Sequence, residues 1–149
     1  DVTTADASLA TSDRLTLVYN IEGQDLQQVA KGTSSAEQLT LSFYIKATKT
    51  GTQIVELFDH DNTRHCAKSV TINSSNTWEK KTITVTGPTS GGNVTPDSAS
   101  NGFRVEWVLG VGSDAETGTL REWTTSNTFR TAPGSVYLNE NAEMSYSLD

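Results

Sequence analysis

Apolar and polar residues alternate along most of this chain, as they do in β-strands that bury one face. The alternation is strict in residues 39–47 and again in residues 103–111. The residues expected to face inward are Leu39, Leu41, Phe43, Ile45 and Ala47 in the first segment and Phe103, Val105, Trp107, Leu109 and Val111 in the second. Both segments are therefore predicted to be strands, and Trp107 is predicted to be a core residue.

Weaker patterns predict further strands and one helical turn, the latter in residues 25–30. Residues 52–58 carry apolar side chains at both phases, which predicts a central strand. A half-buried strand is expected in residues 14–21, with the inward face formed by Leu15, Leu17, Tyr19 and Ile21. The remaining expected strands are residues 64–72, 78–85, 120–123, 136–138 and 144–148. With about nine strands and no crossover helix, the pattern predicts an all-β fold, an antiparallel two-sheet β-sandwich of the jelly-roll type.

A chain of 149 residues fits one domain. Residues 1–13 are small and polar, so a polar arm or linker is expected there, followed by the β-sandwich domain in residues 14–149. Residues 87–102 are rich in Gly, Pro and Ser and are predicted to form a long loop. The first residue is Asp rather than Met, so the chain is expected to be a piece of a longer protein.

Charge narrows the range of partners. Eleven Lys and Arg residues against eighteen Asp and Glu residues give a formal net charge of -7 at pH 7. This balance disfavours nucleic acids and anionic membranes, because both are polyanions. No apolar run approaches the ~20 residues of a membrane-spanning helix, so no membrane insertion is expected. The single cysteine, Cys66, excludes an intrachain disulfide and is expected to be a buried apolar residue.

Several segments together resemble one family. Residues 19–25 read YNIEGQD, residues 41–46 read LSFYIK, residues 49–52 read KTGT and residues 77–83 read TWEKKTI. These segments, with WVLGVG in residues 107–112, resemble the jelly-roll, carbohydrate-binding-module-like domains of tail-fibre and appendage proteins of marine bacteriophages. The chain departs from the family pattern at Tyr44, where the family commonly has Trp, and in its closing strand, residues 144–149.

The resemblance implies a virion structural domain in a tail fibre, spike or other appendage, or on the capsid surface. Its expected partner is a host surface glycan or receptor, and fibres of this kind imply a homotrimer. Two alternatives stay open: a capsid-decoration or assembly protein that binds other virion subunits, and a carbohydrate-binding module of a glycan-degrading enzyme.

Catalytic machinery is not evident in the sequence. The E-x-D-x-(x)-E signature of jelly-roll glycanases does not occur, and the nearest approach to it is Glu56, Asp59 and Asp61. The histidines His60 and His65 lie near Cys66, but no G-x-S-x-G nucleophile elbow is present. We therefore expect a protein that is not an enzyme and that has no cofactor.

Two kinds of binding site are candidates. Asp59, Asp61 and Thr63 place oxygen atoms at alternate positions of a turn, an arrangement that suits a structural calcium ion. A glycan needs flat aromatic rings for its sugar faces and polar groups for its hydroxyls. The aromatic candidates for a glycan-binding platform are Trp78, Trp123, Tyr44 and Tyr137.

Overall fold

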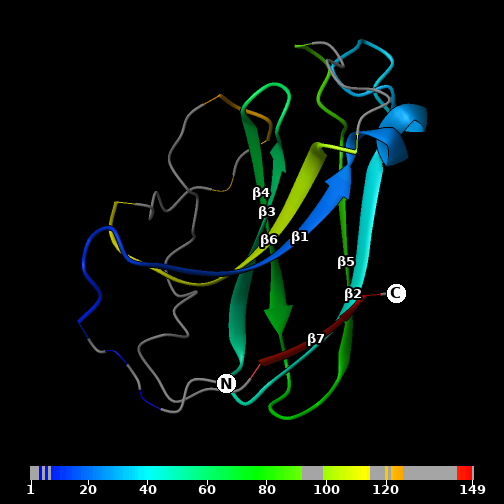
Figure 1. Ribbon diagram of the computed structural model, residues 1–149. Helices are drawn as coiled ribbons and strands as arrows, with labels where there is room; N and C mark the ends of the chain where they lie inside the picture. Colours follow the sequence, from blue (N-terminus) through cyan, green and yellow to red (C-terminus); the bar gives the residue numbers. More distant parts are fainter. Residues whose placement is uncertain are drawn as a thin grey trace.

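The computed structural model describes residues 4, 6, 8–91, 99–114, 120, 122–125 and 144–148. The protein is an all-β sandwich of two antiparallel sheets, as predicted (Figure 1). The strands are β1 (Arg14–Glu22), β2 (Leu39–Ala47), β3 (Gly51–Asp59), β4 (Arg64–Ile72), β5 (Glu79–Val85), β6 (Asn101–Val111) and β7 (Met144–Leu148). A 3-10 helix, η1 (Gly23–Val29), follows β1 and overlaps the helical turn predicted at residues 25–30.

The two sheets differ in size. The larger has the order β1-β6-β3-β4 and the smaller the order β5-β2-β7. Every connection between successive described strands crosses from one sheet to the other, except the β3–β4 hairpin. This alternation between sheets is the behaviour expected of jelly-roll sandwiches. Strand β3 lies between β6 and β4, which confirms the prediction of a central strand from its apolar residues at both phases.

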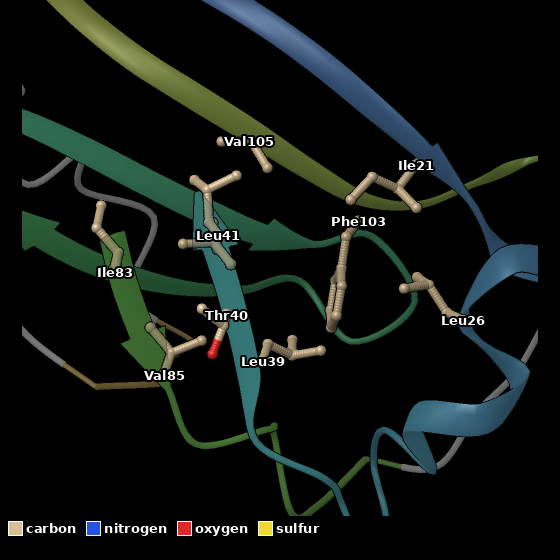
Figure 2. A pocket seen from close by; sticks show the side chains of 10 residues that line it. Ile21, Leu26, Leu39, Thr40, Leu41, Ile83, Val85, Phe103 and Val105 are labelled. Atoms are coloured by element: carbon tan, nitrogen blue, oxygen red, sulfur yellow. The ribbon is translucent and has the colours of Figure 1, made fainter. Parts of the chain in front are cut away.

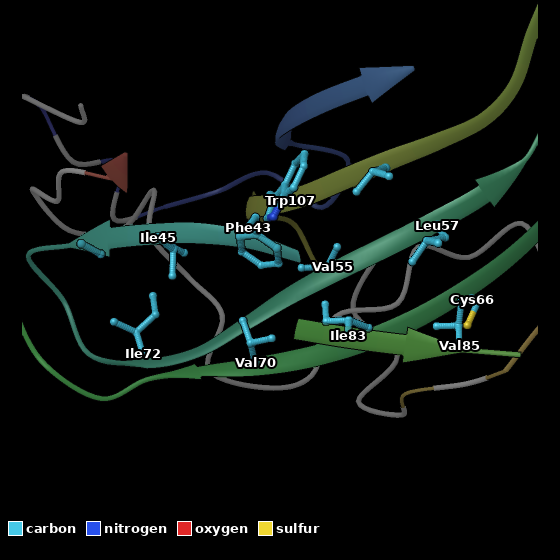
Figure 3. Close-up of a cluster of buried hydrophobic side chains, with 12 residues drawn as sticks. Phe43, Ile45, Val55, Leu57, Cys66, Val70, Ile72, Ile83, Val85 and Trp107 are labelled. Atoms are coloured by element: carbon cyan, nitrogen blue, oxygen red, sulfur yellow. The ribbon is translucent and has the colours of Figure 1, made fainter. Parts of the chain in front are cut away.

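The core lies between the sheets and is built from the inward phase of their strands (Figure 3). Trp107 of β6 is 2% exposed and meets the Phe43 ring edge-on, with ring centroids 5.4 Å apart. Ile45 of β2 and Val55 of β3 are fully buried beside them. Burying side chains of this size stabilises the fold by about 1.5–3 kcal/mol each. Trp107 is thus a core residue, as its phase predicted.

Strand β1 differs from its prediction. Its expected inward residues Leu15, Leu17 and Tyr19 are 38%, 40% and 49% exposed, so the expected half-buried face is wrong for most of the strand. The reason is its position: β1 is the edge of the four-stranded sheet, and the three-stranded sheet opposite ends at β7. Alternation places these side chains on the inner side, where the smaller sheet does not cover them.

Two further segments differ from or extend the predictions. The end of the polar arm pairs with the chain after β6, where Gly112 N donates to Asp13 O at 2.7 Å. Gly112 is required there, because a Cβ would lie 2.0 Å from Ala10 O.

Residues 122–125 are not a strand and form an isolated bridge between Thr124 and His65. The strand expected at residues 136–138 lies outside the described residues.

Candidate functional site

The outer face of the three-stranded sheet is composed of hydroxyl-bearing and basic side chains. The register places nine strand residues on it, namely Thr40, Ser42, Tyr44, Lys46, Lys80, Thr82, Thr84, Ser145 and Ser147. We call these residues the hydroxyl face. None of the nine is acidic and none is aliphatic, although the whole chain carries a net charge of -7.

The hydroxyls of this face are only weakly engaged with one another. Thr40 lies opposite Thr84 and Ser42 opposite Thr82, with the hydroxyl oxygens of each pair 3.4 Å apart. Hydrogen bonds between hydroxyls normally span about 2.7–2.8 Å. The four hydroxyls therefore keep most of their capacity to bond a ligand from solution.

Tyr44 and Trp78, two of the aromatic candidates, belong to this region. Tyr44 lies at the middle of the face, between Lys80 on β5 and Ser147 on β7. The Lys80 ammonium is 5.7 Å from the centroid of the Tyr44 ring. Trp78 comes two residues before Lys80 and is 49% exposed, and continued alternation places it on the same side of the sheet. The region thus combines two aromatic rings with hydroxyl and ammonium donors.

The other two aromatic candidates are not part of this region. Trp123 stacks on Phe103, with ring centroids 5.6 Å apart and planes at 17°. Its Nε1 donates to the Thr86 carbonyl oxygen at 2.6 Å, just beyond the end of β5 that is opposite Trp78. One face and the polar edge of this partly buried indole thus have packing roles beside the core. Tyr137 lies outside the described residues.

The acidic turn between β3 and β4 holds a lysine where calcium was expected. The ammonium of Lys31 is 2.9 Å from Asp59 Oδ1 and also pairs with Asp61. Asn62 Nδ2 donates to the second oxygen of Asp59 at 2.8 Å. Lys31 is fully buried and lies over the Phe103 ring, 5.2 Å from its centroid. Its positive charge thus occupies the space between the two carboxylates that a cation would need.

Thr63, the third residue of the expected calcium site, is in the left-handed backbone region with a φ of 49°. Within the described residues, no group of three or more His, Cys, Asp and Glu side chains could hold a metal ion. Asp59 and Asp61 therefore act together on Lys31, a residue 28 positions before Asp59 that local spacing does not reveal.

A buried charged cluster lies on the outer face of the four-stranded sheet. Glu56 of β3 and Glu106 of β6 are direct cross-strand partners and are 0% and 1% exposed. Glu56 Oε1 lies 2.6 Å from His65 Nδ1, whereas Glu106 pairs with Arg14 and Arg104. The two carboxylates are thus enclosed by cationic or protonatable groups on three other strand positions.

Of this cluster, sequence reasoning considered Glu56 and His65 but missed Glu106 and both arginines. The signal that links them is their common outward phase on neighbouring strands, which emerges only once the register is known. Paired carboxylates are a catalytic device only where substrate can reach them. Because both are buried, the arrangement supports charge pairing within the fold.

Cys66 is a buried apolar residue, as predicted. It is fully buried in the core between the sheets. Burial raises the pKa of its thiol to about 12, and the nearby Glu122 carboxylate adds to this effect. A nucleophilic thiolate is therefore disfavoured near neutral pH.

An apolar cavity of about 110 Å³ opens between the sheets near η1 (Figure 2). Leu26, Leu41 and Phe103 point into it, with Thr40 as the one residue with a polar side chain among those lining it. A binding site for a polar ligand needs several convergent polar groups. This cavity could accommodate apolar groups, but its lining does not provide the polar contacts that a site for a polar ligand needs.

Comparisons with protein-family models, with curated proteins and with solved structures found no match. No helix in the described part of the chain is long and apolar enough to cross a membrane.

Proposed function

We propose that this chain is a non-enzymatic structural domain of a bacteriophage tail fibre, spike or other appendage, and that it binds a host surface glycan through the hydroxyl face. The observation that carries the glycan-binding part is the placement of Tyr44 among hydroxyl and ammonium groups, with the exposed Trp78 at the edge of the same region. The virion setting rests on the family resemblance of the segments that include Tyr44 and Trp78.

The chemistry of the face suits a sugar. A pyranose has a C–H-rich side that stacks on an aromatic ring and hydroxyls around its rim that need hydrogen-bond partners. The hydroxyl face supplies the ring of Tyr44, Trp78 adds a second ring at its edge, and the hydroxyls recur at the strand spacing of about 4.8 Å. A flat saccharide lying across β2 and β5 would therefore meet several partners at once.

The absence of an enzymatic role is supported by the surroundings of the acidic residues. Glu56 and Glu106 are buried, and Asp59 is committed to Lys31. No carboxylate lies among the nine residues of the hydroxyl face, where a bound glycan would need a general acid. The proposed role is thus recognition without cleavage.

The test is binding of the fluorescently labelled chain to intact host cells and to an array of neutral and acidic glycans. Replacing Tyr44 or Trp78 by Ala should weaken binding by up to about tenfold, because an aromatic stacking contact contributes about 0.5–1.5 kcal/mol. The matched controls are Tyr44→Phe and Trp78→Phe, which keep a ring and should bind within about threefold of the unaltered chain.

Circular dichroism and thermal unfolding would establish that each variant is folded. If the unaltered chain binds no glycan on the array and no host cell, the glycan part of the proposal is wrong. Equal binding by the Ala and Phe variants would likewise place the contact elsewhere on the molecule.

A further inference from the structure

Strand β1 presents an apolar edge. It pairs with β6 on one side, and none of the described residues pairs with it on the other. Seven large apolar side chains in the described part of the chain are exposed, and four of them belong to β1. The four are Leu15, Leu17, Val18 and Tyr19, and the others are Trp78, Leu120 and Leu148. An exposed apolar edge strand of nine residues is a template for pairing with another strand.

The sequence of β1 is complementary to itself in the antiparallel direction. When RLTLVYNIE is laid against a reversed copy centred on Val18, Arg14 meets Glu22 and Thr16 meets Asn20. On the other face Leu15 meets Ile21 and Leu17 meets Tyr19. Every pair then joins opposite charges, two polar residues or two apolar residues.

Neighbouring registers lose this match. Centring on Leu17 places Arg14 opposite Asn20, and centring on Tyr19 places Thr16 opposite Glu22. A shift of one residue in one strand would put its apolar side chains on the opposite face from those of its partner. Cross-strand pairs that match in kind stabilise a sheet by about 0.2–1 kcal/mol each, which favours the Val18-centred register.

We propose that two copies of this chain associate through β1, antiparallel and with the two-fold axis at Val18, so that their four-stranded sheets form one continuous sheet. The interface is isologous, because each copy contributes the same strand. It covers Leu15, Leu17 and Val18, which are 38–43% exposed in the single chain.

The surroundings of β1 extend the same surface. A groove beside the strand is lined by Leu17, Tyr19, Tyr146 and Leu148. In the paired arrangement Leu17 of one copy contacts Tyr19 of the other at the mouth of this groove. The pairing is independent of the hydroxyl face, which lies on the outer side of the other sheet, and a dimer would present two such faces.

The decisive experiment exploits the Thr16–Asn20 pair. A chain carrying Thr16→Lys and Asn20→Lys places like charges opposite each other twice in the dimer, and Thr16→Glu with Asn20→Glu does the same with the opposite sign. Each should weaken self-association at least ~100-fold, because like-charge juxtaposition costs several kcal/mol. Mixing the two altered chains should restore a dimer, since every lysine then faces a glutamate.

Sedimentation velocity over a concentration series measures the association of each sample. The matched control is Thr82→Lys with Thr84→Lys, which adds the same charges to exposed positions of β5 and should leave the dimer intact. Restoration by mixing shows at once that both altered chains fold. A monomeric or trimeric unaltered chain, a dimer that persists in the lysine chain, or a mixture that stays monomeric would each overturn the proposal.

Discussion

The outer faces of the two sheets differ in how far their side chains are buried. On the four-stranded sheet, the outward residues Ile54 and Glu56 of β3 are fully buried, and Val108 of β6 is 2% exposed. On the three-stranded sheet, the outward residues Thr40 of β2 and Thr84 of β5 are exposed. The middle of one outer face, on β3 and β6, is therefore buried, whereas the other outer face is open to solvent.

This difference in burial determines how charged side chains are accommodated on each face. A charge that is removed from water must be paired, and Glu106 is accordingly held by Arg14 and Arg104. A charge at the open face, such as that of Lys80 beside Tyr44, remains in contact with solvent. The same alternation of side chains thus produces a buried network of charge pairs on one sheet and, on the other, the solvent-exposed surface that we propose for glycan binding.

Removing Glu106 should have the largest effect. Glu106→Ala leaves the guanidinium groups of Arg14 and Arg104 without the buried carboxylate that pairs with them. We expect the free energy of unfolding to fall by about 3 kcal/mol, in line with broken buried pairs. Urea denaturation monitored by tryptophan fluorescence measures this loss, provided that the slope with urea is unchanged.

The matched control is Glu37→Ala, which removes a carboxylate from an exposed position. It should change the free energy of unfolding by no more than about 0.5 kcal/mol. A similar small loss for Glu106→Ala would mean that its carboxylate is solvated in solution, and the contrast between the two faces would then fail.

The next prediction concerns pH and His60. Burial lowers the pKa of His60 below its ordinary value, and the positive charge of Arg104 adds to this effect. The ring lies edge-on to Phe58, with centroids 4.6 Å apart. Folding thus favours the neutral ring, whereas the unfolded chain binds a proton once the pH falls below about 6.5.

Stability should therefore decrease as the pH falls from about 7.5 through 6.5 towards the lowered pKa of His60. His60→Gln removes the titrating ring and should flatten the melting temperature over the same range. Asp59 and Asp61 oppose the shift and Lys31 supports it, and all three remain in both chains. Identical pH dependence in the two chains would show that His60 is not the responsible group.

The sequence was most informative where alternation was strict. The predictions for β2 and β6 were confirmed because each has a long run of one period, and Trp107 followed from its phase in the second run. Cys66 followed from its phase in the weaker pattern of residues 64–72. The prediction for β1 was wrong in its burial for a physical reason. Alternation tells which side chains share a face, but not how far the opposing sheet extends.

The candidate site was predictable in its residues more than in its arrangement. Tyr44 and Trp78 were identified as candidates because a glycan-binding site needs flat aromatic rings. Their hydroxyl and lysine neighbours depend on the pairing of β2 with β5, about 40 residues apart in sequence, as in the 40-residue separation of Ser42 and Thr82. The Lys31–Asp59 pair is non-local in the same way, so a calcium site was the natural expectation from the turn alone.

The smallest predicted effect is at the open face, where Lys80→Ala removes the cation above the Tyr44 ring. An exposed cation–π contact contributes about 0.5–1 kcal/mol, so the free energy of unfolding should fall by about 0.5 kcal/mol. Lys80→Arg keeps a cation and should keep the stability. In a double-mutant cycle with Tyr44→Leu, the two losses should be less than additive. Fully additive losses would mean that the ring and the ammonium act separately and that Lys80 has no part in positioning Tyr44.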